Sequence, residues 1–266
     1  MIESCHPKSA ATVILARPDL HGAFEVFITR RPRGMNFLGG MYVFPGGTVR
    51  KEDYSESTLR LCLGLAREEA QQMLGMQLSP ELSLGHWTAG IRELFEETGI
   101  LLCVDKSGKP PDTGEEQLKG RLAGKRKALV EGSMDFREIL KSEQLFSHGA
   151  ALAYFSHWLT PEEFSMRFDT RFFVAQLPPD QSPLASSEEV TESRWIKPER
   201  AVDLCERGEL PMIFPTFASL RTLADFDSLE SLFEEYGLGA KKRSPLAVEL
   251  QHGSRDGSVK ATLDSQ

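Results

Sequence analysis

The chain has 266 residues, of which 40% are hydrophobic and 26% are charged, and its formal net charge is −8. This composition is typical of a globular domain, and the negative charge argues against non-specific binding to nucleic acids or anionic membranes. No apolar run approaches the roughly 18–20 residues that a membrane-spanning helix needs.

Cysteine usage and the two ends of the chain predict a reducing, cytoplasmic location. The cysteines form no close pair, so neither a zinc site nor a disulfide framework is expected. The first residues, MIESCHPKSAATVILAR, lack the basic-then-apolar layout of a secretory signal. The last three, DSQ, match no common peroxisomal or endoplasmic-reticulum address.

The first hundred residues predict strands followed by helices. Residues 11–17 and 25–30 are expected to form two strands joined by a turn at 18–22, and a glycine- and arginine-rich loop follows. That loop contains one short apolar run, at 41–44. Residues 54–86 are expected to be helical because apolar side chains recur at three- and four-residue steps. The segment GIRELFEETGILL, at 90–102, predicts a helix that ends at Gly99 and then a strand at 100–104.

The second half repeats the mixture of helices and strands. A polar loop precedes a charged helical stretch at 115–145, which is broken at Gly132 and Ser133. Strands are expected at 150–162, 170–177 and 190–196, and short helices at 198–205, 217–224 and 228–236. From residue 240 the sequence lacks periodicity and predicts a flexible tail. This order of elements favours an α/β sandwich over a bundle or a barrel.

Three carboxylates, on Glu93, Glu96 and Glu97, crowd the end of the helix at 90–98. Negative charge is disfavoured there by the helix macrodipole, by roughly 0.3–1 kcal/mol each. Residues three and four apart share a helix face, so these carboxylates also repel one another. A divalent cation reverses that repulsion, and oxygen ligands suit Mg²⁺ or Mn²⁺ better than zinc. An ordinary solvated amphipathic helix is the alternative for these residues taken alone.

A second motif, FPGG at 44–47, ends the short apolar run in two glycines that let the backbone approach a metal or a phosphate. Together the two motifs resemble the Nudix hydrolase signature G-x5-E-x7-R-E-U-x-E-E-x-G-U, in which U is apolar. The matching residues are Gly47, Arg92, Glu93, Leu94, Glu96, Glu97, Gly99 and Ile100. Asp53 stands where the signature has its first Glu. Between Asp53 and Arg92 there are 38 residues, 54–91, where the signature has only seven between its first Glu and its Arg.

This surplus is interpreted as an insertion inside the motif. Such an insertion resembles the branch of the family that includes the peroxisomal coenzyme A diphosphatases, as do the phrases RFDTRFFVAQL and FSHWLTP. The resemblance implies a Nudix-type α/β/α sandwich with a mixed sheet, in one domain over 1–239. Helical insertions are expected at 54–86 and 106–147, C-terminal helices at 198–239, and the flexible tail at 240–266.

Coenzyme A-specific members carry a further pattern, L-L-T-x-R-[SA]-x3-R-x3-G-x3-F-P-G-G. Here FITRRPRGMNFLGGMYVFPGG supplies Thr29, Arg31, Gly40 and residues 44–47, but Pro32 and Asn36 depart from it. The substrate-binding residues that this partial match implies are Arg31, Arg33, Gly46 and Gly47. A solubilising basic loop is the alternative for the arginines.

The resemblance assigns roles to the motif residues. The ligands of Mg²⁺ or Mn²⁺ would be the acids Glu93, Glu96 and Glu97 and the carbonyl of Gly47. Arg92 would orient the acids, and Asp53 could do the same through water. The general base stays open between Glu93 and an acid of the SSEEVTESRWI segment, Glu188 or Glu189. His157 and Trp158 are expected to pack in the core.

The implied reaction is hydrolysis of a nucleoside diphosphate linked to another moiety. The first substrate is coenzyme A or acyl-coenzyme A, giving 3′,5′-ADP and (acyl-)phosphopantetheine. ADP-ribose, NADH or a dinucleoside polyphosphate is the alternative within the same class. A Nudix-fold module that binds a nucleotide without cleaving it is the alternative of another class, favoured by Asp53 and the insertion but opposed by the intact RELFEE. The expected partner is a nucleotide-type small molecule, with no nucleic acid and no membrane, and a homodimer is allowed.

Overall fold

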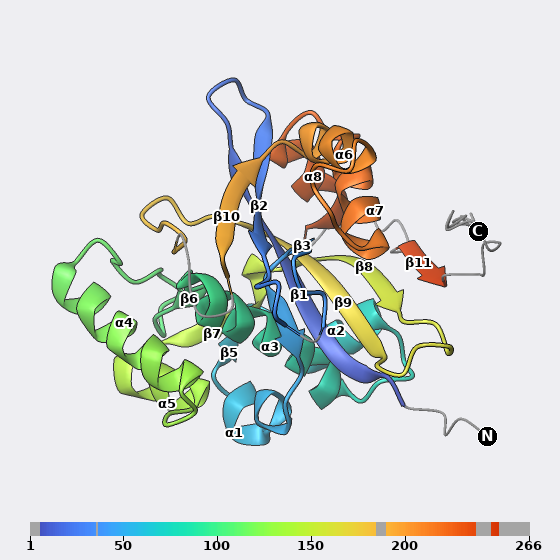
Figure 1. Ribbon diagram of the computed structural model, residues 1–266. Helices are drawn as coiled ribbons and strands as arrows, with labels where there is room; N and C mark the ends of the chain where they lie inside the picture. The colour runs from blue at the N-terminus through green and yellow to red at the C-terminus, as the bar shows by residue number, and fades with distance from the viewer. Residues whose placement is uncertain (1–5, 36, 185–189, 238–245, 250–266) are drawn as a thin grey trace.

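The computed structural model describes residues 6–35, 37–184, 190–237 and 246–249 (Figure 1). Its main sheet has the strand order β10-β2-β1-β9-β8-β11, with β3 beside β2 and β4 beside β1. Strand β1 runs parallel to β9 and antiparallel to β2 and β4, so the sheet is mixed. The strands are β1 (Lys8–Pro18), β2 (Phe24–Arg30), β3 (Tyr42–Val43), β4 (Gly46–Thr48), β8 (Ala153–Leu159), β9 (Phe168–Gln176), β10 (Glu192–Ile196) and β11 (Leu246–Glu249).

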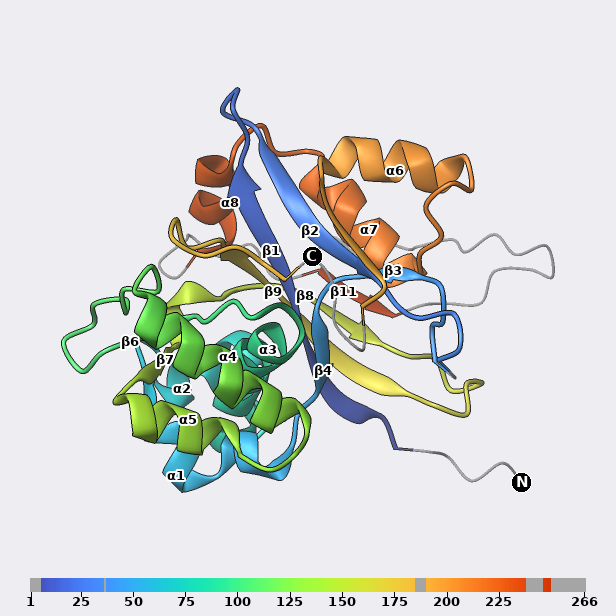
Figure 2. The same cartoon turned by 60° about the vertical axis from the view of Figure 1, so that its left-hand side comes forward.

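Helices cover both faces of this sheet (Figures 1 and 2). Alternate side chains of β1 point to opposite faces: Val13 belongs to the core under helix α3 (Pro80–Thr98), and Ile14 belongs to the core on the other face. The second core is closed by α6 (Pro198–Glu206), α7 (Phe214–Leu223) and α8 (Leu229–Tyr236). The expected α/β/α sandwich with a mixed sheet is confirmed.

Helix α3 is longer than the sequence predicts. It begins at Pro80, where the hydroxyl of Ser79 accepts a hydrogen bond from the Leu82 amide at 3.1 Å. It ends as expected at Gly99, whose φ of 76° is left-handed and whose amide donates to the Phe95 carbonyl at 2.9 Å. The last third of α3 therefore carries the acidic motif, and its first part lies inside the stretch predicted as an insertion.

The stretch at 54–86 is not continuously helical, which corrects the prediction. It contains the end of the 3₁₀ helix η1 (Lys51–Tyr54), then α1 (Glu56–Leu59), β5 (Cys62–Leu63) and α2 (Arg67–Leu74) before α3 begins. Gly64 and Gly75 interrupt the helical pattern with φ angles of 82° and 107°. Strand β5 joins a second small sheet, ordered β5-β7-β6, with β6 (Cys103–Val104) and β7 (Phe146–His148). The strand expected at 100–104 is thus limited to its last two residues.

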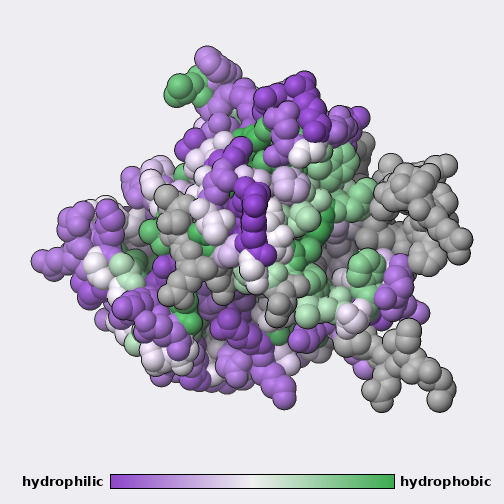
Figure 3. Space-filling view, in the orientation of Figure 1, coloured by the Kyte–Doolittle hydropathy of each residue, from purple (hydrophilic) through white to green (hydrophobic). Residues whose placement is uncertain are grey.

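The second insertion forms two helices, α4 (Glu116–Val130) and α5 (Phe136–Glu143), separated at Gly132 as predicted. The ring of Phe136 lies 6.1 Å from that of Phe95, so α5 packs on the motif helix. The exposed sides of α4 and α5 are mainly hydrophilic, whereas apolar surface gathers below α6 and α7 (Figure 3). The two insertions and α3 share one apolar core, which fixes their positions relative to the motif.

The C-terminal stretch differs from the prediction at one place. Strand β11 pairs in parallel with β8, although the sequence predicts a flexible tail from residue 240. The remainder of that tail, 240–245 and 250–266, lies outside the described residues. The single domain over 1–239 stays a prediction. Across the described part of the chain, no helix combines the length and apolar character needed to span a membrane.

Candidate active site

The acidic motif meets strand β4 on the face of the sheet that α3 covers. Glu93 and Glu97 are 7% and 8% exposed. A Cβ atom placed on Gly47 would lie 2.6 Å from the Glu93 carboxylate, so the β4 backbone runs directly against that side chain. Strand β4 is held in place by pairing with β1, where Gly47 faces Ala11. Glu93 and Gly47, 46 positions apart, are therefore neighbours, as the predicted metal site requires.

Arg92 is the centre of the charge network and is only 2% exposed. Its Nε and Nη2 donate to the two carboxylate oxygens of Asp53, both at 2.8 Å. Its Nη1 donates to Glu93 at 2.6 Å and to Glu96 at 3.0 Å, and its Nη2 also reaches the Thr48 carbonyl at 2.9 Å. Arg92 thus contacts two of the three motif acids directly, Glu93 and Glu96.

The role of Asp53 is more direct than the sequence suggests. The sequence predicts that Asp53 orients the helix acids through water, and Asp is one methylene shorter than the Glu of the signature. Instead Asp53 sits in η1, accepts the Arg50 amide at 2.8 Å, and is carried close enough for a bidentate contact with Arg92. Bidentate guanidinium–carboxylate pairs fix orientation strongly. The 3₁₀ turn thus compensates for the shorter side chain.

Arg50 is a site residue that the sequence analysis missed. Its Nη1 and Nη2 each donate to one carboxylate oxygen of Glu96 at 3.1 Å, and Nη2 lies 3.9 Å from Glu93. The only signal in the sequence was a basic residue three positions after Gly47, inside the motif loop. Burial raises the pKa of Glu93, with Glu96 adding to the rise and Arg92 opposing it. Because of this burial, Glu93 binds a proton more readily than an exposed carboxylate does, even beside Arg92.

Some of the motif acids, but not all of them, are placed to bind a divalent cation. Among the described residues, no three His, Cys, Asp or Glu side chains gather into a group that could hold a metal ion. Glu96 is turned toward Arg50 and Arg92 instead of joining the other acids. Glu93 and Glu97, four residues apart on one helix, still supply the buried oxygen ligands that Mg²⁺ or Mn²⁺ prefers. These two acids and the Gly47 carbonyl would hold such an ion, and Glu96 would join only if Arg50 moved away.

Replacing Gly47 by Ala tests the close approach of β4 to Glu93. The new methyl group would displace a carboxylate that Arg92 holds in place. We expect kcat/KM to fall by about 10²-fold, the loss associated with a displacement of about 1 Å in an active site. Steady-state kinetics would be compared with Gly120→Ala, on the exposed side of α4, where the added Cβ meets nothing within 4 Å. Equal activity of the two variants would contradict the placement.

The basic loop after β2 is folded back on itself. The Arg31 amide donates to the Met41 carbonyl at 3.1 Å, and the Gly40 amide donates to the Arg31 carbonyl at 3.0 Å. The buried Nε of Arg31 has no hydrogen-bond partner among the described residues. Gly46 is required beside β1, because a Cβ there would lie 2.5 Å from the Ala11 carbonyl oxygen. Asn36, Glu188 and Glu189 lie outside the described residues.

Of the two residues expected to pack, only Trp158 does so fully. It is 5% exposed and lies against Phe214, with ring centroids 5.8 Å apart. His157 instead joins a polar cluster: its Nε2 lies 2.6 Å from a carboxylate oxygen of Asp169, which also forms an ion pair with Arg171. Arg171 is 1% exposed and pairs across the sheet with Ala11. The sequence analysis did not detect this cluster.

The cluster makes stability depend on pH. Burial alone would raise the pKa of Asp169, but the hydrogen bond with His157 and the charge of Arg171 lower it to about 2. Because this pKa is below the ordinary value of 3.8, the ionised carboxyl stabilises the fold above pH 3.8 and loses that effect as pH falls toward 2. The difference in unfolding free energy between wild type and Asp169→Asn should therefore shrink by about 2 kcal/mol from pH 5 to pH 2.

Urea unfolding at several pH values measures this difference. Asp180→Asn, at an exposed position, is the matched control. A difference between wild type and Asp169→Asn that stays constant over the same pH range would contradict the prediction.

A mixed sheet between helices, with Arg92 and three acids on the helix that faces a glycine strand, defines a Nudix pyrophosphohydrolase. Residues 70–223 match the family model described as the NUDT19 Nudix domain, more than half of the chain. The chain therefore belongs to the Nudix hydrolase family and has a NUDT19-type domain. This match begins after Gly47 and Asp53, so these two are placed by the structure and the motif alone.

Known proteins support the same assignment. The chain is 26% identical to acyl-coenzyme A diphosphatase NUDT19 of Xenopus laevis, over 85% of this chain and 71% of that protein. It is 29% identical to the Gallus gallus protein of the same name, over 85% of this chain and 70% of that protein. The crystal structure of a Nudix hydrolase from Alicyclobacillus acidocaldarius is similar, with a TM-score of 0.68 and 23% identity over 88% of this chain and 98% of that one. The similarity to this crystal structure shows that the chain has the same fold.

Proposed function

We propose that the protein hydrolyses the diphosphate of coenzyme A or acyl-coenzyme A, releasing 3′,5′-ADP and (acyl-)phosphopantetheine. The observation that carries the proposal is the direct Asp53–Arg92 pair, which assembles the Nudix motif across an insertion. The substrate is suggested by the named relatives and by the partial coenzyme A pattern around Arg31. An unpaired donor on Arg31 suits a phosphate group.

The reaction adds water to one phosphorus and breaks its bond to the bridging oxygen. A bound Mg²⁺ or Mn²⁺ would neutralise the diphosphate and lower the pKa of the attacking water. Glu93 and Glu97 would hold this ion, and Arg92 keeps Glu93 in position against β4. Because burial raises its pKa, Glu93 is also suited to accept the proton of the water. Glu189 is the alternative base.

The structure removes the main argument for a module that only binds. That alternative depended on Asp53 as a defect of the motif, yet Asp53 makes the bidentate contact with Arg92 that the motif needs. Two buried acids one helical turn apart, Glu93 and Glu97, would also repel each other in a pure binder that holds no cation between them.

Product analysis tests the proposal. Purified protein with Mg²⁺ or Mn²⁺ would be incubated with coenzyme A, an acyl-coenzyme A, ADP-ribose and NADH, and the phosphate esters separated. We expect 3′,5′-ADP from the first two, none from Glu97→Gln, and normal amounts from Glu68→Gln, whose side chain is exposed on α2. Turnover of ADP-ribose or NADH alone would keep the hydrolase and reject coenzyme A as the substrate.

A further inference from the structure

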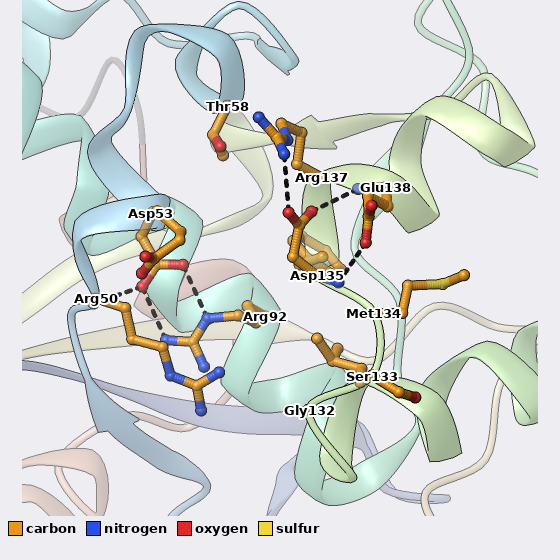
Figure 4. Close-up of a pocket in the computed structure, with 13 residues that line it drawn as sticks. Arg50, Asp53, Thr58, Arg92, Gly132, Ser133, Met134, Asp135, Arg137 and Glu138 are labelled. Atoms are coloured by element: carbon orange, nitrogen blue, oxygen red, sulfur yellow. Dashed lines mark hydrogen bonds and ion pairs between the residues drawn. The ribbon is translucent and has the colours of Figure 1, made fainter.

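A cavity of about 390 Å³ lies beside the Asp53–Arg92 pair (Figure 4). One wall is the segment from Arg50 to Thr58, which opens the first insertion. The opposite wall is the turn between α4 and α5, in the second insertion (Figure 4). Arg137 joins the two walls, because its Nη1 donates to the Ser57 hydroxyl at 3.1 Å. Both insertions thus build one cavity at the side of the motif helix.

Most of the charged groups that line this cavity are held in ion pairs or in a helix cap, and Glu52 is exposed at its edge. Asp53 is neutralised by Arg92, and Asp135 pairs with Arg137 at 2.9 Å. Glu138 accepts the Asp135 amide at 2.8 Å and so completes the N-terminal cap of α5. Leu129, Met134 and Phe136 add apolar surface. A lining of this kind favours an uncharged ligand with amide and methyl groups over a phosphate.

The cavity is connected to the catalytic acids through Arg50. This side chain lines the cavity and also holds Glu96 at 3.1 Å, with Glu93 3.9 Å away. The loop at 31–41, which carries the basic residues, lies on the other side of β4 from α4 and α5 (Figure 2). A substrate whose diphosphate meets Glu93 and Glu97 thus has a basic loop on one side and, on the other, a cavity whose charges are mostly paired.

We propose that this cavity receives the pantetheine arm of the substrate, while the phosphoadenosine end faces the loop at 31–41. The inference depends on the proposed function and adds a role for the two insertions. The arm is uncharged between its phosphate and its thiol and carries two amides and a pair of methyl groups, which match the compensated lining. The 3′-phosphate requires the opposite environment, and the loop carries Arg31 and Arg33 with no Asp or Glu between positions 31 and 41. The volume lies within the roughly 300–1,000 Å³ of small-molecule pockets.

Two neighbouring positions of η1 allow a matched test. Glu52 and Lys51 are both exposed. Glu52 lines the cavity, whereas Lys51 does not. Glu52→Trp would add bulk at the cavity, and Lys51→Trp adds the same ring next to it. Ser133→Trp adds bulk from the opposite wall, where Ser133 is exposed. Circular dichroism and melting temperatures would verify that each variant is folded.

We expect Glu52→Trp and Ser133→Trp to raise KM for coenzyme A by about tenfold and to weaken binding of 4′-phosphopantetheine equally. Binding of 3′,5′-ADP, measured by calorimetry, should stay within about twofold, as should all values for Lys51→Trp. Unchanged binding of 4′-phosphopantetheine in both cavity variants would overturn the inference. Weaker binding of 3′,5′-ADP instead, or an equal effect of Lys51→Trp, would overturn it as well.

The wild-type protein separates this inference from the proposed function. If wild type does not cleave coenzyme A, the proposed function fails and the inference fails with it. If wild type cleaves coenzyme A and the cavity variants bind 4′-phosphopantetheine normally, only the inference fails.

Discussion

Replacing Glu97 by Gln is expected to lower kcat/KM by about 10²–10³-fold or more, the range seen when one group that stabilises a transition-state charge is removed. Glu97 is 8% exposed and lies one helical turn after Glu93, so its carboxylate is placed to share a cation with that side chain. Glutamine preserves the shape but removes the charge. The loss should therefore affect activity far more than folding.

Three measurements distinguish this effect from a general loss of structure. Kinetics with excess Mn²⁺ shows whether weaker metal binding explains the loss, calorimetric titration with Mn²⁺ measures that binding directly, and thermal unfolding monitors the fold. Glu68→Gln, an exposed substitution of the same kind, should change none of them. Full activity of Glu97→Gln at ordinary Mn²⁺ concentrations would exclude this residue from the metal site.

Replacing Arg92 by Met is expected to have the largest effect on stability. The change leaves the carboxylates of Asp53, Glu93 and Glu96 without their shared cation in a site that excludes most water. Breaking a buried pair in this way costs about 3–5 kcal/mol. For a chain of this size that corresponds to a melting temperature lower by roughly 6–20 °C. Thermal unfolding in EDTA measures the shift without contributions from bound metal.

Replacing Asp53, the partner of Arg92, should give a smaller loss of stability for comparison. Asp53→Asn should cost less than Arg92→Met, because Arg92 would keep Glu93, Glu96 and the Thr48 carbonyl. The double variant should be more stable than the sum of the two losses predicts, since one change removes the group that the other leaves unpaired. Arg60→Met, which breaks an exposed pair with Glu56, should cost at most about 1 kcal/mol. Similar shifts for Arg92→Met and Arg60→Met would contradict the buried network.

The Asp53–Arg92 pair explains how a Nudix motif tolerates an insertion. The two parts of the motif are separated by the 38 residues 54–91, but the first part is anchored by β4 on β1 and the second by α3 on the sheet. Each part is therefore positioned independently by the core. The inserted residues add their own apolar side chains to that core, among them Leu59, Leu65 and Ala70, so they do not push the two parts away from each other.

Local patterns in the sequence were sufficient for part of this picture. The turn between β1 and β2, the glycine at the end of α3 and the spacing of the motif acids depend on residues a few positions apart. They predicted the sandwich and the helix that carries Glu93 and Glu97. The same patterns misjudged residues 54–86, because a helical period of apolar residues does not reveal where Gly64 and Gly75 turn the chain.

Contacts between distant residues were decided by the tertiary structure alone. Arg50 meets Glu96, His157 meets Asp169 across two strands, and Ser57 meets Arg137 across the cavity. The sequence shows that such charged and polar residues exist, but each could pair with many others. Packing of both insertions against α3 selects among these pairs, because the shared apolar core fixes which polar groups face one another. Local sequence motifs thus predicted which residues carry the chemistry of this protein. The arrangement of those residues in space was decided by packing of the apolar core.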